Sequence, residues 1–146
     1  VRCFNTVGPR QTGQYGMVLP KFVKAALLDQ PIVVYGSGKQ TRCFADVSDV
    51  VGAFVKLMNT AECEGEVFNV GTTESISIED LAQKVKEMCS SKSRIEYMSY
   101  EAAFEEGFED MMNRMPDLNK IKEYIGYEPK YKLDDIITRM IKYYEN

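Results

Sequence analysis

The 146-residue chain contains no histidine. Without it there can be no Ser-His-Asp triad, no histidine ligand for a metal ion and no imidazole proton shuttle. Long apolar runs are also missing. No stretch approaches the roughly 20 residues that a membrane-spanning helix requires, and no signal peptide opens the sequence. We therefore expect no membrane association and no histidine-dependent catalysis.

Basic residues are outnumbered, with 18 Lys and Arg against 22 Asp and Glu, which gives a net charge of −4 and an isoelectric point near 5.0. Nucleic-acid-binding proteins rely on an excess of positive charge, so no nucleic-acid partner is expected. The hydrophobic share of 45% and charged share of 27% are typical of a folded globular chain. A single domain over residues 1–146 can bury roughly 70% of its unfolded surface.

Cysteine is scarce, and its four positions suggest neither a disulfide framework nor a metal site. Cys3, Cys43, Cys63 and Cys89 form no C-x-x-C pair and show no zinc-ligand spacing. We expect four buried or half-buried free thiols in a reducing compartment, which favours a cytoplasmic location, and no bound metal.

Predicted strands alternate with predicted helices, which indicates the α/β class. Short apolar runs predict the strands, and apolar residues at helical spacing predict the helices. The expected strands cover residues 1–4, 32–35, 66–70 and 94–98, and the expected helices cover 18–28, 47–58, 78–88, 118–125 and 133–144. A loop is expected over 5–16, and a short helix followed by a loop over 100–115. Because the chain starts inside a strand, we expect it to be the C-terminal piece of a longer protein.

The helix starts carry recognisable capping residues. Asp46 or Ser48 is expected to cap the helix over 47–58, Ser77 the next helix and Asp117 a later one. In the helix over 47–58 one buried face is expected, made of Val47, Val50, Val51, Phe54, Val55 and Met58.

Three polar segments in loops or at strand ends are candidates for ligand binding. Asn5–Gly13 combines neutral hydrogen-bonding groups with glycines, Tyr35–Arg42 contains a Gly-Ser-Gly turn followed by phosphate-binding donors, and Asn113–Asp117 carries an arginine in an acidic stretch. Each has a structural alternative: a turn-forming asparagine, a solvated hairpin, and an arginine that neutralises nearby carboxylates at Glu105, Glu106 or Glu109.

The order and spacing of these segments resemble the C-terminal part of a nucleotide-sugar epimerase/dehydratase, an extended short-chain dehydrogenase/reductase. The chain is similar to UDP-glucose 4-epimerases and UDP-glucuronate decarboxylases over nearly its whole length. The resemblance depends on the segments Val1–Arg10, Tyr15–Phe22, Val34–Phe44, Val67–Gly71, Arg114–Asp117 and Ile125–Pro129.

The resemblance implies a set of residues that bind a UDP-sugar, and two contacts to the cofactor NAD. The implied substrate-binding residues are Asn5, Leu19, Pro20, Phe22, Tyr35, Gln40, Arg42, Asn69 and Arg114. Arg42 and Arg114 would bind the diphosphate, where each charge-assisted contact contributes roughly 1.5–3 kcal/mol. Asn5 would contact the diphosphate or sugar, and its neighbours Phe4 and Thr6 would touch the nicotinamide end of NAD.

Two motifs of this family are missing from the sequence. There is no G-x-G-x-x-G loop for NAD, and no Tyr-x-x-x-Lys catalytic pair in the family's order, so no catalytic residue is expected in this chain. The expected fold is the substrate-binding C-terminal portion of an extended short-chain dehydrogenase/reductase. It would hold the last strands of the Rossmann sheet and a small mixed α/β lobe, without the NAD-binding core. The resemblance also implies that the parent protein is a homodimer.

Within the family, the sequence favours an NAD-dependent UDP-sugar 4-epimerase that acts through a 4-keto intermediate. Met17 and Met115 stand where decarboxylases often carry Arg and Lys, which weakens a UDP-glucuronate decarboxylase assignment. That activity and a 4,6-dehydratase remain alternatives because they share the first oxidation. A non-catalytic nucleotide-sugar-binding module and a purely structural remnant are alternatives from other classes.

Overall fold

The structure is a computed structural model that describes residues 1–11, 17–100 and 111–145. Its helices are α1 (Val18–Leu27), α2 (Val47–Met58), α3 (Ile78–Met88), α5 (Asn119–Ile125) and α6 (Leu133–Tyr144), with a short 3-10 turn at Ala61–Cys63. Its strands are β1 (Arg2–Cys3), β2 (Thr6–Val7), β3 (Ile32–Tyr35), β4 (Thr41–Cys43), β5 (Ala45–Asp46), β6 (Asn69–Val70), β7 (Ser75–Ser77), β8 (Ile95–Met98) and β9 (Asn113–Arg114).

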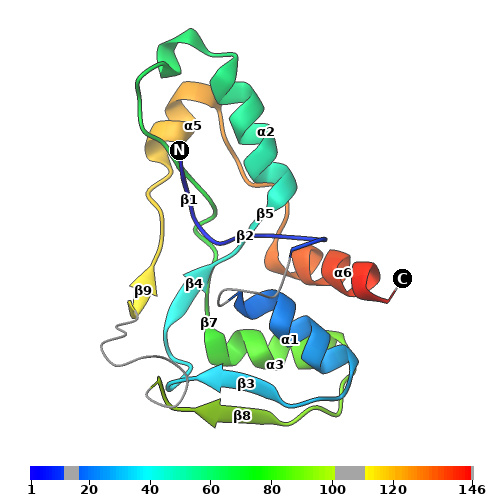
Figure 1. Cartoon of the computed structure of the whole chain (residues 1–146). Coiled ribbons are helices and arrows are strands. Elements are labelled where there is room, and N and C mark those ends of the chain that lie inside the picture. Colours follow the sequence, from blue (N-terminus) through cyan, green and yellow to red (C-terminus); the bar gives the residue numbers. More distant parts are fainter. Residues whose placement is uncertain (12–16, 101–110, 146) are drawn as a thin grey trace.

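The described strands form four small sheets. Three are parallel pairs, β1 with β6, β2 with β5 and β3 with β8. In the fourth sheet β4 is central, antiparallel to β7 and parallel to β9. Figure 1 shows that β4 and β7 run along the middle of an elongated molecule, between α2 and α5 at one end and β3 and β8 at the other.

The larger hydrophobic core lies where α1, α3 and α6 pack together beside β3. In α6 the side chains of Leu133, Ile136, Ile137 and Met140 are buried at the spacing i, i+3, i+4 and i+7, which is one face of a helix. The helix begins where the Asp135 carboxylate accepts a hydrogen bond from the Lys132 N–H at 3.0 Å. This core fixes α1, whose first turn borders the candidate site.

A second hydrophobic core joins α2, α5 and β6. Phe68, Val70 and Ile121 are buried there beside Tyr127, whose hydroxyl donates to the Gly71 carbonyl at 2.9 Å. The carboxylate of Asp49 on α2 accepts hydrogen bonds from the backbone N–H groups of Lys130 and Tyr131 at 3.0 and 3.1 Å. These bonds satisfy backbone donors in the segment between α5 and α6.

The expected buried face of α2 is wrong in most of its members. Val50 is buried, but Val47, Val51, Phe54, Val55 and Met58 are exposed, Met58 to 86%. The side of the helix that packs inward carries Asp49, Val50, Ala53 and Leu57 instead. Hydrophobic spacing predicted the helix, but its apolar residues extend beyond the side that α5 and β6 cover.

The predicted helices are confirmed, with starts and ends shifted by at most a residue. Asp46 caps α2 by accepting from the Ser48 N–H, and Ser77 caps α3 by accepting from the Asp80 N–H. Asp117 accepts from the Asn119 N–H at 2.9 Å, although α5 itself begins two residues later. The predicted helix over part of 100–115 falls mainly on residues 101–110, which lie outside the described residues.

The strand predictions were less accurate. The strands over 32–35 and 94–98 are confirmed within a residue, whereas those over 1–4 and 66–70 shorten to two residues each. β2 falls in the expected loop over 5–16, and β4, β5, β7 and β9 were not predicted. Strands of two or three residues are too short to show an alternating pattern in sequence.

All four cysteines are free thiols. Cys43 and Cys63 are buried and Cys89 is half-buried as expected, but Cys3 is exposed on β1. Burial raises the pKa of the Cys43 thiol; a nearby Glu74 charge adds to this rise and a hydrogen bond with Ser75 opposes it. Among the described residues, no helix is both long enough and apolar enough to cross a membrane.

Candidate functional site

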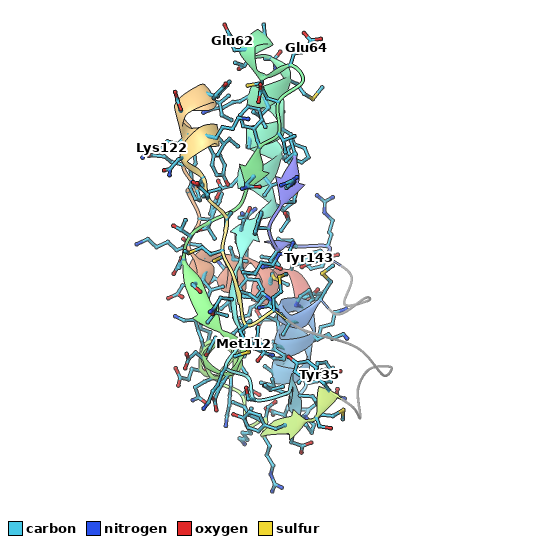
Figure 2. The ribbon with its side chains drawn as sticks, turned by 90° about the vertical axis from the view of Figure 1, so that its left-hand side faces the viewer. Tyr35, Glu62, Glu64, Met112, Lys122 and Tyr143 are labelled. Carbon is cyan, nitrogen blue, oxygen red and sulfur yellow. The ribbon has the colours of Figure 1, made fainter. Side chains whose placement is uncertain are left out.

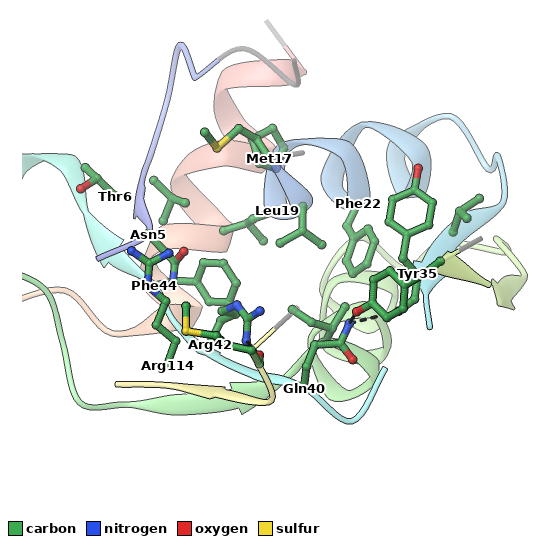
Figure 3. Close-up of a pocket in the computed structure, with 17 residues that line it drawn as sticks. Asn5, Thr6, Met17, Leu19, Phe22, Tyr35, Gln40, Arg42, Phe44 and Arg114 are labelled. Atoms are coloured by element: carbon green, nitrogen blue, oxygen red, sulfur yellow. Dashed lines mark hydrogen bonds between the residues drawn. The ribbon is translucent and has the colours of Figure 1, made fainter. Parts of the chain in front are cut away.

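A cavity of about 500 Å³ lies between the start of α1, the turn after β3 and the strands β4 and β9 (Figure 3). Its size falls in the range of ligand-binding pockets, and most of its lining is apolar. Nine of the eleven predicted binding residues line it: Asn5, Thr6, Leu19, Pro20, Phe22, Tyr35, Gln40, Arg42 and Arg114.

Two guanidinium groups come from neighbouring strands. Arg42 on β4 and Arg114 on β9 are register partners in the parallel pair, so their side chains project from the same face of the sheet. Arg42 Nη1 donates to the carbonyl oxygens of Thr41 at 2.7 Å and Met111 at 2.8 Å. The Thr41 hydroxyl donates to Asn113 Oδ1 at 2.9 Å, which ties the same two strands one position earlier.

Asn5 lies against these strands through its own side chain. Its side-chain amide nitrogen donates to the Cys43 carbonyl at 3.0 Å, and its backbone carbonyl accepts from the Ala45 N–H at 3.2 Å. The backbone of Asn5 has φ of +36°, in the left-handed region that asparagine tolerates better than most residues. The strained turn between β1 and β2 therefore brings the Asn5 amide beside the end of β4.

Phe4 does not line the cavity but lies under one of its arginines. The Arg114 guanidinium carbon is 5.2 Å from the centre of the Phe4 ring, within the range of a cation–π contact. Phe4 itself is held at the end of β1, where its N–H donates to the Val70 carbonyl at 2.9 Å. The ring therefore orients a guanidinium that makes no other contact with a partner among the described residues.

Asn69, the other predicted binding residue that does not line the cavity, makes a hydrogen bond with another part of the chain. Its side-chain amide donates to the Asp117 carbonyl at 3.1 Å, and its backbone belongs to β6, opposite Arg2 on β1. In the structure it therefore connects the β1–β6 pair to the segment that enters α5.

The far end of the cavity is apolar and aromatic. Leu19, Pro20 and Phe22 are buried in α1, and Tyr35 lies at the end of β3 (Figure 3). Gln40, also buried, donates through its side-chain amide to the Tyr35 carbonyl at 3.0 Å and to the Tyr100 hydroxyl at 2.8 Å. An apolar slot with a fixed amide suits a planar heterocycle better than a charged group.

Sequence reasoning missed several lining residues, among them Phe44, Tyr100 and Met111. Phe44 comes directly after β4, which is too short for its alternation to show in the sequence. Tyr100 and Met111 flank residues 101–110 and reach the cavity only through tertiary contacts, so no local pattern could have pointed to them.

The charge of the lining is positive. Among the described residues that line the cavity, the two arginines are the charged side chains, and no carboxylate, lysine or cysteine accompanies them. Asn5 and Thr6 add neutral hydrogen-bonding groups. This composition favours binding of a dianion attached to an apolar ring system.

The segments that carry these residues are those of an extended short-chain dehydrogenase/reductase. A sequence profile of the GDP-mannose 4,6 dehydratase family matches residues 1–140, and the chain belongs to that family. It is 38% identical to a UDP-N-acetyl-alpha-D-glucosaminuronate decarboxylase from Bacillus cytotoxicus, across 99% of this chain and 45% of the relative. Identity to UDP-glucuronic acid decarboxylase 4 of Arabidopsis thaliana is also 38%, over 97% of this chain and 30% of the plant protein.

Solved structures share the fold. UDP-glucose 4-epimerase from Thermotoga maritima, solved with UDP-glucose, is 29% identical with a TM-score of 0.87, over 99% of this chain and 44% of that one. Pal from Bacillus thuringiensis is 28% identical with a TM-score of 0.85, with the same coverage. The chain therefore corresponds to a C-terminal portion of the family's mixed α/β fold, as the sequence predicted, and spans less than half the length of these relatives.

Proposed function

We propose that this chain is the UDP-sugar-binding portion of an NAD-dependent nucleotide-sugar 4-epimerase. The observation that carries the proposal is the register pairing of Arg42 with Arg114, which aims two guanidinium groups into one cavity with Asn5 beside them. A diphosphate diester carries two negative charges and accepts hydrogen bonds on every non-bridging oxygen. Two guanidinium groups on one side match both its charge and its shape.

The remaining parts of a UDP-sugar fit the two ends of the cavity. The apolar end around Phe22 and Tyr35 would hold the uracil ring, with Gln40 available at its edge. The sugar would then extend past the arginines towards Asn5 and Thr6. In this arrangement the chain binds and orients the substrate, and residues elsewhere in the whole protein carry out proton transfer.

Only a marginal contact to NAD fits the residues present. When bound, NAD supplies the hydride acceptor for oxidation of the sugar at C4. Thr6 lines the cavity and would contact one edge of the cofactor, and its hydroxyl oxygen has no hydrogen-bond partner among the residues that the structure describes. With no glycine-rich phosphate loop in the sequence, the body of the cofactor would have to be held by another part of the protein.

Decarboxylation of a UDP-uronic acid is a second candidate. It is favoured by the names of the curated relatives, because both of those described above, each at 38% identity, are decarboxylases. Both reactions begin with the same oxidation and use the same diphosphate contacts. The arginine pair is therefore compatible with both epimerisation and decarboxylation, and only the part of the site that holds the sugar can distinguish the two reactions.

Calorimetric titration of the 146-residue chain with UDP tests the binding proposal. Binding of UDP is expected to be at least about tenfold tighter than binding of uridine, because only UDP engages the two arginines. Equal heats for UDP and uridine would contradict the diphosphate assignment. No heat at millimolar UDP would contradict binding altogether and favour a structural remnant.

Turnover separates the enzyme proposal from a non-catalytic binding module. We expect no conversion of UDP-glucose to UDP-galactose when this chain alone is supplied with NAD, since its sequence contains no glycine-rich loop to hold the cofactor. The full-length protein that carries this segment should perform the conversion. A full-length protein that binds UDP-glucose without converting it would support the binding module instead.

A further inference from the structure

Asn69 in β6 and Gly71 directly after it lie beside the segment that follows Arg114. Neither residue lines the cavity, but each lies next to a residue two or three positions beyond that arginine. The segment from Met112 to Lys122 leads from β9 to α5 along the length of the molecule (Figure 2). Contacts between this segment and the end of β6 therefore affect where Arg114 lies.

Gly71 is buried beside Phe4 and Pro116. A Cβ added to it would lie 3.0 Å from the Phe4 Cβ and 3.2 Å from the Pro116 Cγ, both closer than an ordinary carbon–carbon contact. Unlike Gly36, Gly71 does not have a left-handed backbone conformation. The position therefore uses the small size of glycine, because a larger residue would push the Phe4 ring away from the chain that carries Arg114.

Hydrogen bonds hold the backbone around Gly71 in place. The Phe4 N–H donates to the Val70 carbonyl at 2.9 Å, and the Tyr127 hydroxyl donates to the Gly71 carbonyl at 2.9 Å. The Cβ of Phe4 is attached directly to this backbone, and the ring of the buried Pro116 is closed on its own backbone nitrogen, so neither atom can rotate away. An added Cβ would therefore be accommodated only by a backbone shift.

Asn69 holds the same segment through its side chain. Its amide nitrogen donates to the Asp117 carbonyl at 3.1 Å. β6 also pairs with β1, at the end of which lies Phe4, the ring that faces the Arg114 guanidinium carbon at 5.2 Å. The end of β6 therefore fixes both the aromatic ring and the chain that follows the arginine.

We infer that Asn69 and Gly71 are positioning residues for Arg114. Asn69 fixes the chain after the arginine, and Gly71 leaves the space in which the Phe4 ring supports the guanidinium. In this role neither residue has to touch the ligand, which replaces the substrate contact expected for Asn69. The inference rests on the proposed function, in which Arg114 binds the diphosphate.

Calorimetry with UDP and with uridine measures the effect on binding. Gly71→Ala and Asn69→Ala are each expected to weaken UDP binding about two- to fivefold, the equivalent of an exposed cation–π contact, and to leave uridine binding unchanged. In an Arg114→Ala background neither substitution should weaken UDP binding further, because the group that they position is gone.

Two substitutions in or directly after α2 are matched controls. Asn59→Ala also removes a side-chain amide that donates to a backbone carbonyl, that of Val55 at 2.7 Å. Gly52→Ala adds a Cβ that would meet nothing within 4 Å. Neither residue lines the cavity, so both variants should bind UDP as the wild-type chain does.

A second measurement does not depend on UDP. The Nε–H proton of Arg114, identified by its absence in Arg114→Ala, lies near an aromatic ring, whose ring current shifts its nuclear magnetic resonance signal. Phe4→Leu should abolish this shift, and Gly71→Ala and Asn69→Ala should reduce it. Gly52→Ala should leave it unchanged.

The outcomes separate the inference from the function on which it depends. If UDP does not bind the wild-type chain, the proposed function fails, and the Arg114 signal alone decides whether the arginine is positioned from β6. If UDP binds and neither variant weakens it, or if the Arg114 signal is the same in both variants as in the wild type, the inference alone is overturned.

A general loss of structure would give a different result. It would weaken uridine binding as much as UDP binding, or would persist in the Arg114→Ala background, and either result would overturn the inference. If Gly71→Ala does not fold, the comparison of Asn69→Ala with Asn59→Ala decides the question.

Discussion

Arg42 and Arg114 occupy directly opposed register positions on β4 and β9, with both guanidinium groups on the same face of the sheet. Like charges directly opposite each other on a sheet are destabilising unless an anion lies between them. Their other contacts differ. Arg42 donates to the Met111 carbonyl and so helps to hold β9, whereas Arg114 lies over the Phe4 ring.

Removing Arg114 should affect binding more than folding. Arg114→Ala is expected to weaken UDP binding by about 1.5–3 kcal/mol, which is roughly tenfold or more. The free energy of unfolding should change by less than about 1 kcal/mol, because the variant loses one cation–π contact and also one like-charge repulsion. Calorimetry and urea unfolding measure the two effects. An unchanged UDP affinity would contradict the diphosphate role.

Removing Arg42 should weaken UDP binding and also lower the free energy of unfolding. Arg42→Ala is expected to weaken UDP binding by a similar amount, about 1.5–3 kcal/mol, and also to lower the free energy of unfolding by about 1 kcal/mol, since the Met111 carbonyl loses its donor. Arg94→Ala, an exposed arginine outside the cavity lining, is the matched control and should change neither quantity appreciably. Equal effects of Arg94→Ala and Arg42→Ala would indicate a non-specific loss of charge.

Gly36, in the turn after β3, lies too close to the Tyr100 ring for a larger residue to fit without a shift. Gly36 has φ of +67°, and a Cβ added to it would lie 2.3 Å from the Tyr100 ring. Gly36→Ala should therefore lower the free energy of unfolding by about 3 kcal/mol, through left-handed strain and steric overlap together. Thermal or urea unfolding provides the measurement.

Gly126 is the matched control for that substitution. It also has a left-handed backbone, with φ of +59°, but a Cβ there would meet nothing within 4 Å. Gly126→Ala should cost only about 1–2 kcal/mol and should leave UDP binding unchanged. Similar costs at both glycines would mean that the Tyr100 ring moves away freely and does not form a rigid wall of the cavity.

Ionisation of Tyr127 should make stability depend on pH in the alkaline range. Burial, with a smaller contribution from the Asp49 charge, raises the pKa of Tyr127 to about 12, against about 10 for an exposed tyrosine. Because the pKa is raised in the folded state, its stabilising contribution is complete below pH 10. It is lost progressively as the pH rises towards 12.

Comparison with Tyr127→Phe isolates this effect. At pH 8 the variant should be about 1 kcal/mol less stable, because the hydrogen bond to the Gly71 carbonyl is lost. Between pH 10 and pH 12 the difference should shrink as the unfolded wild-type chain ionises and the phenylalanine variant does not. A constant difference over this range in urea unfolding would contradict the raised pKa.

The ion pair between Arg139 and Asp46 should contribute more to the free energy of unfolding than an exposed ion pair does. Asp46 is fully buried, and its carboxylate caps α2 while it accepts from Arg139 at 2.6 Å. Arg139→Met should lower the free energy of unfolding by about 2–3 kcal/mol, because it leaves a buried charge with only one donor. Lys84→Met breaks an exposed ion pair with Asp134 and should cost less than about 1 kcal/mol. Equal costs would contradict this prediction.

Much of the fold was predictable from local patterns. Apolar spacing predicts α3 and α6, and Ser77 and Asp46 predict the starts of the helices that they cap, because these signals act within one or two turns. Which side of α2 faces the core was not predictable, since apolar residues occupy more than one face of the helix. In addition, Asp49 is buried because its carboxylate accepts a hydrogen bond from the backbone of Lys130, far away in the sequence. Local spacing predicts where a helix forms but does not specify what covers it.

The sequence alone determined the family and the order of the candidate site residues, because the strings around Asn5, Arg42 and Arg114 can be compared with a family without knowing the fold. Only the tertiary structure decided that these three share one cavity and that Asn69 does not. Register across β4 and β9 depends on hydrogen bonds between segments far apart in the chain, and β9 is too short for any local pattern to reveal. Position in space follows from those long-range contacts, and no spacing along the sequence encodes them.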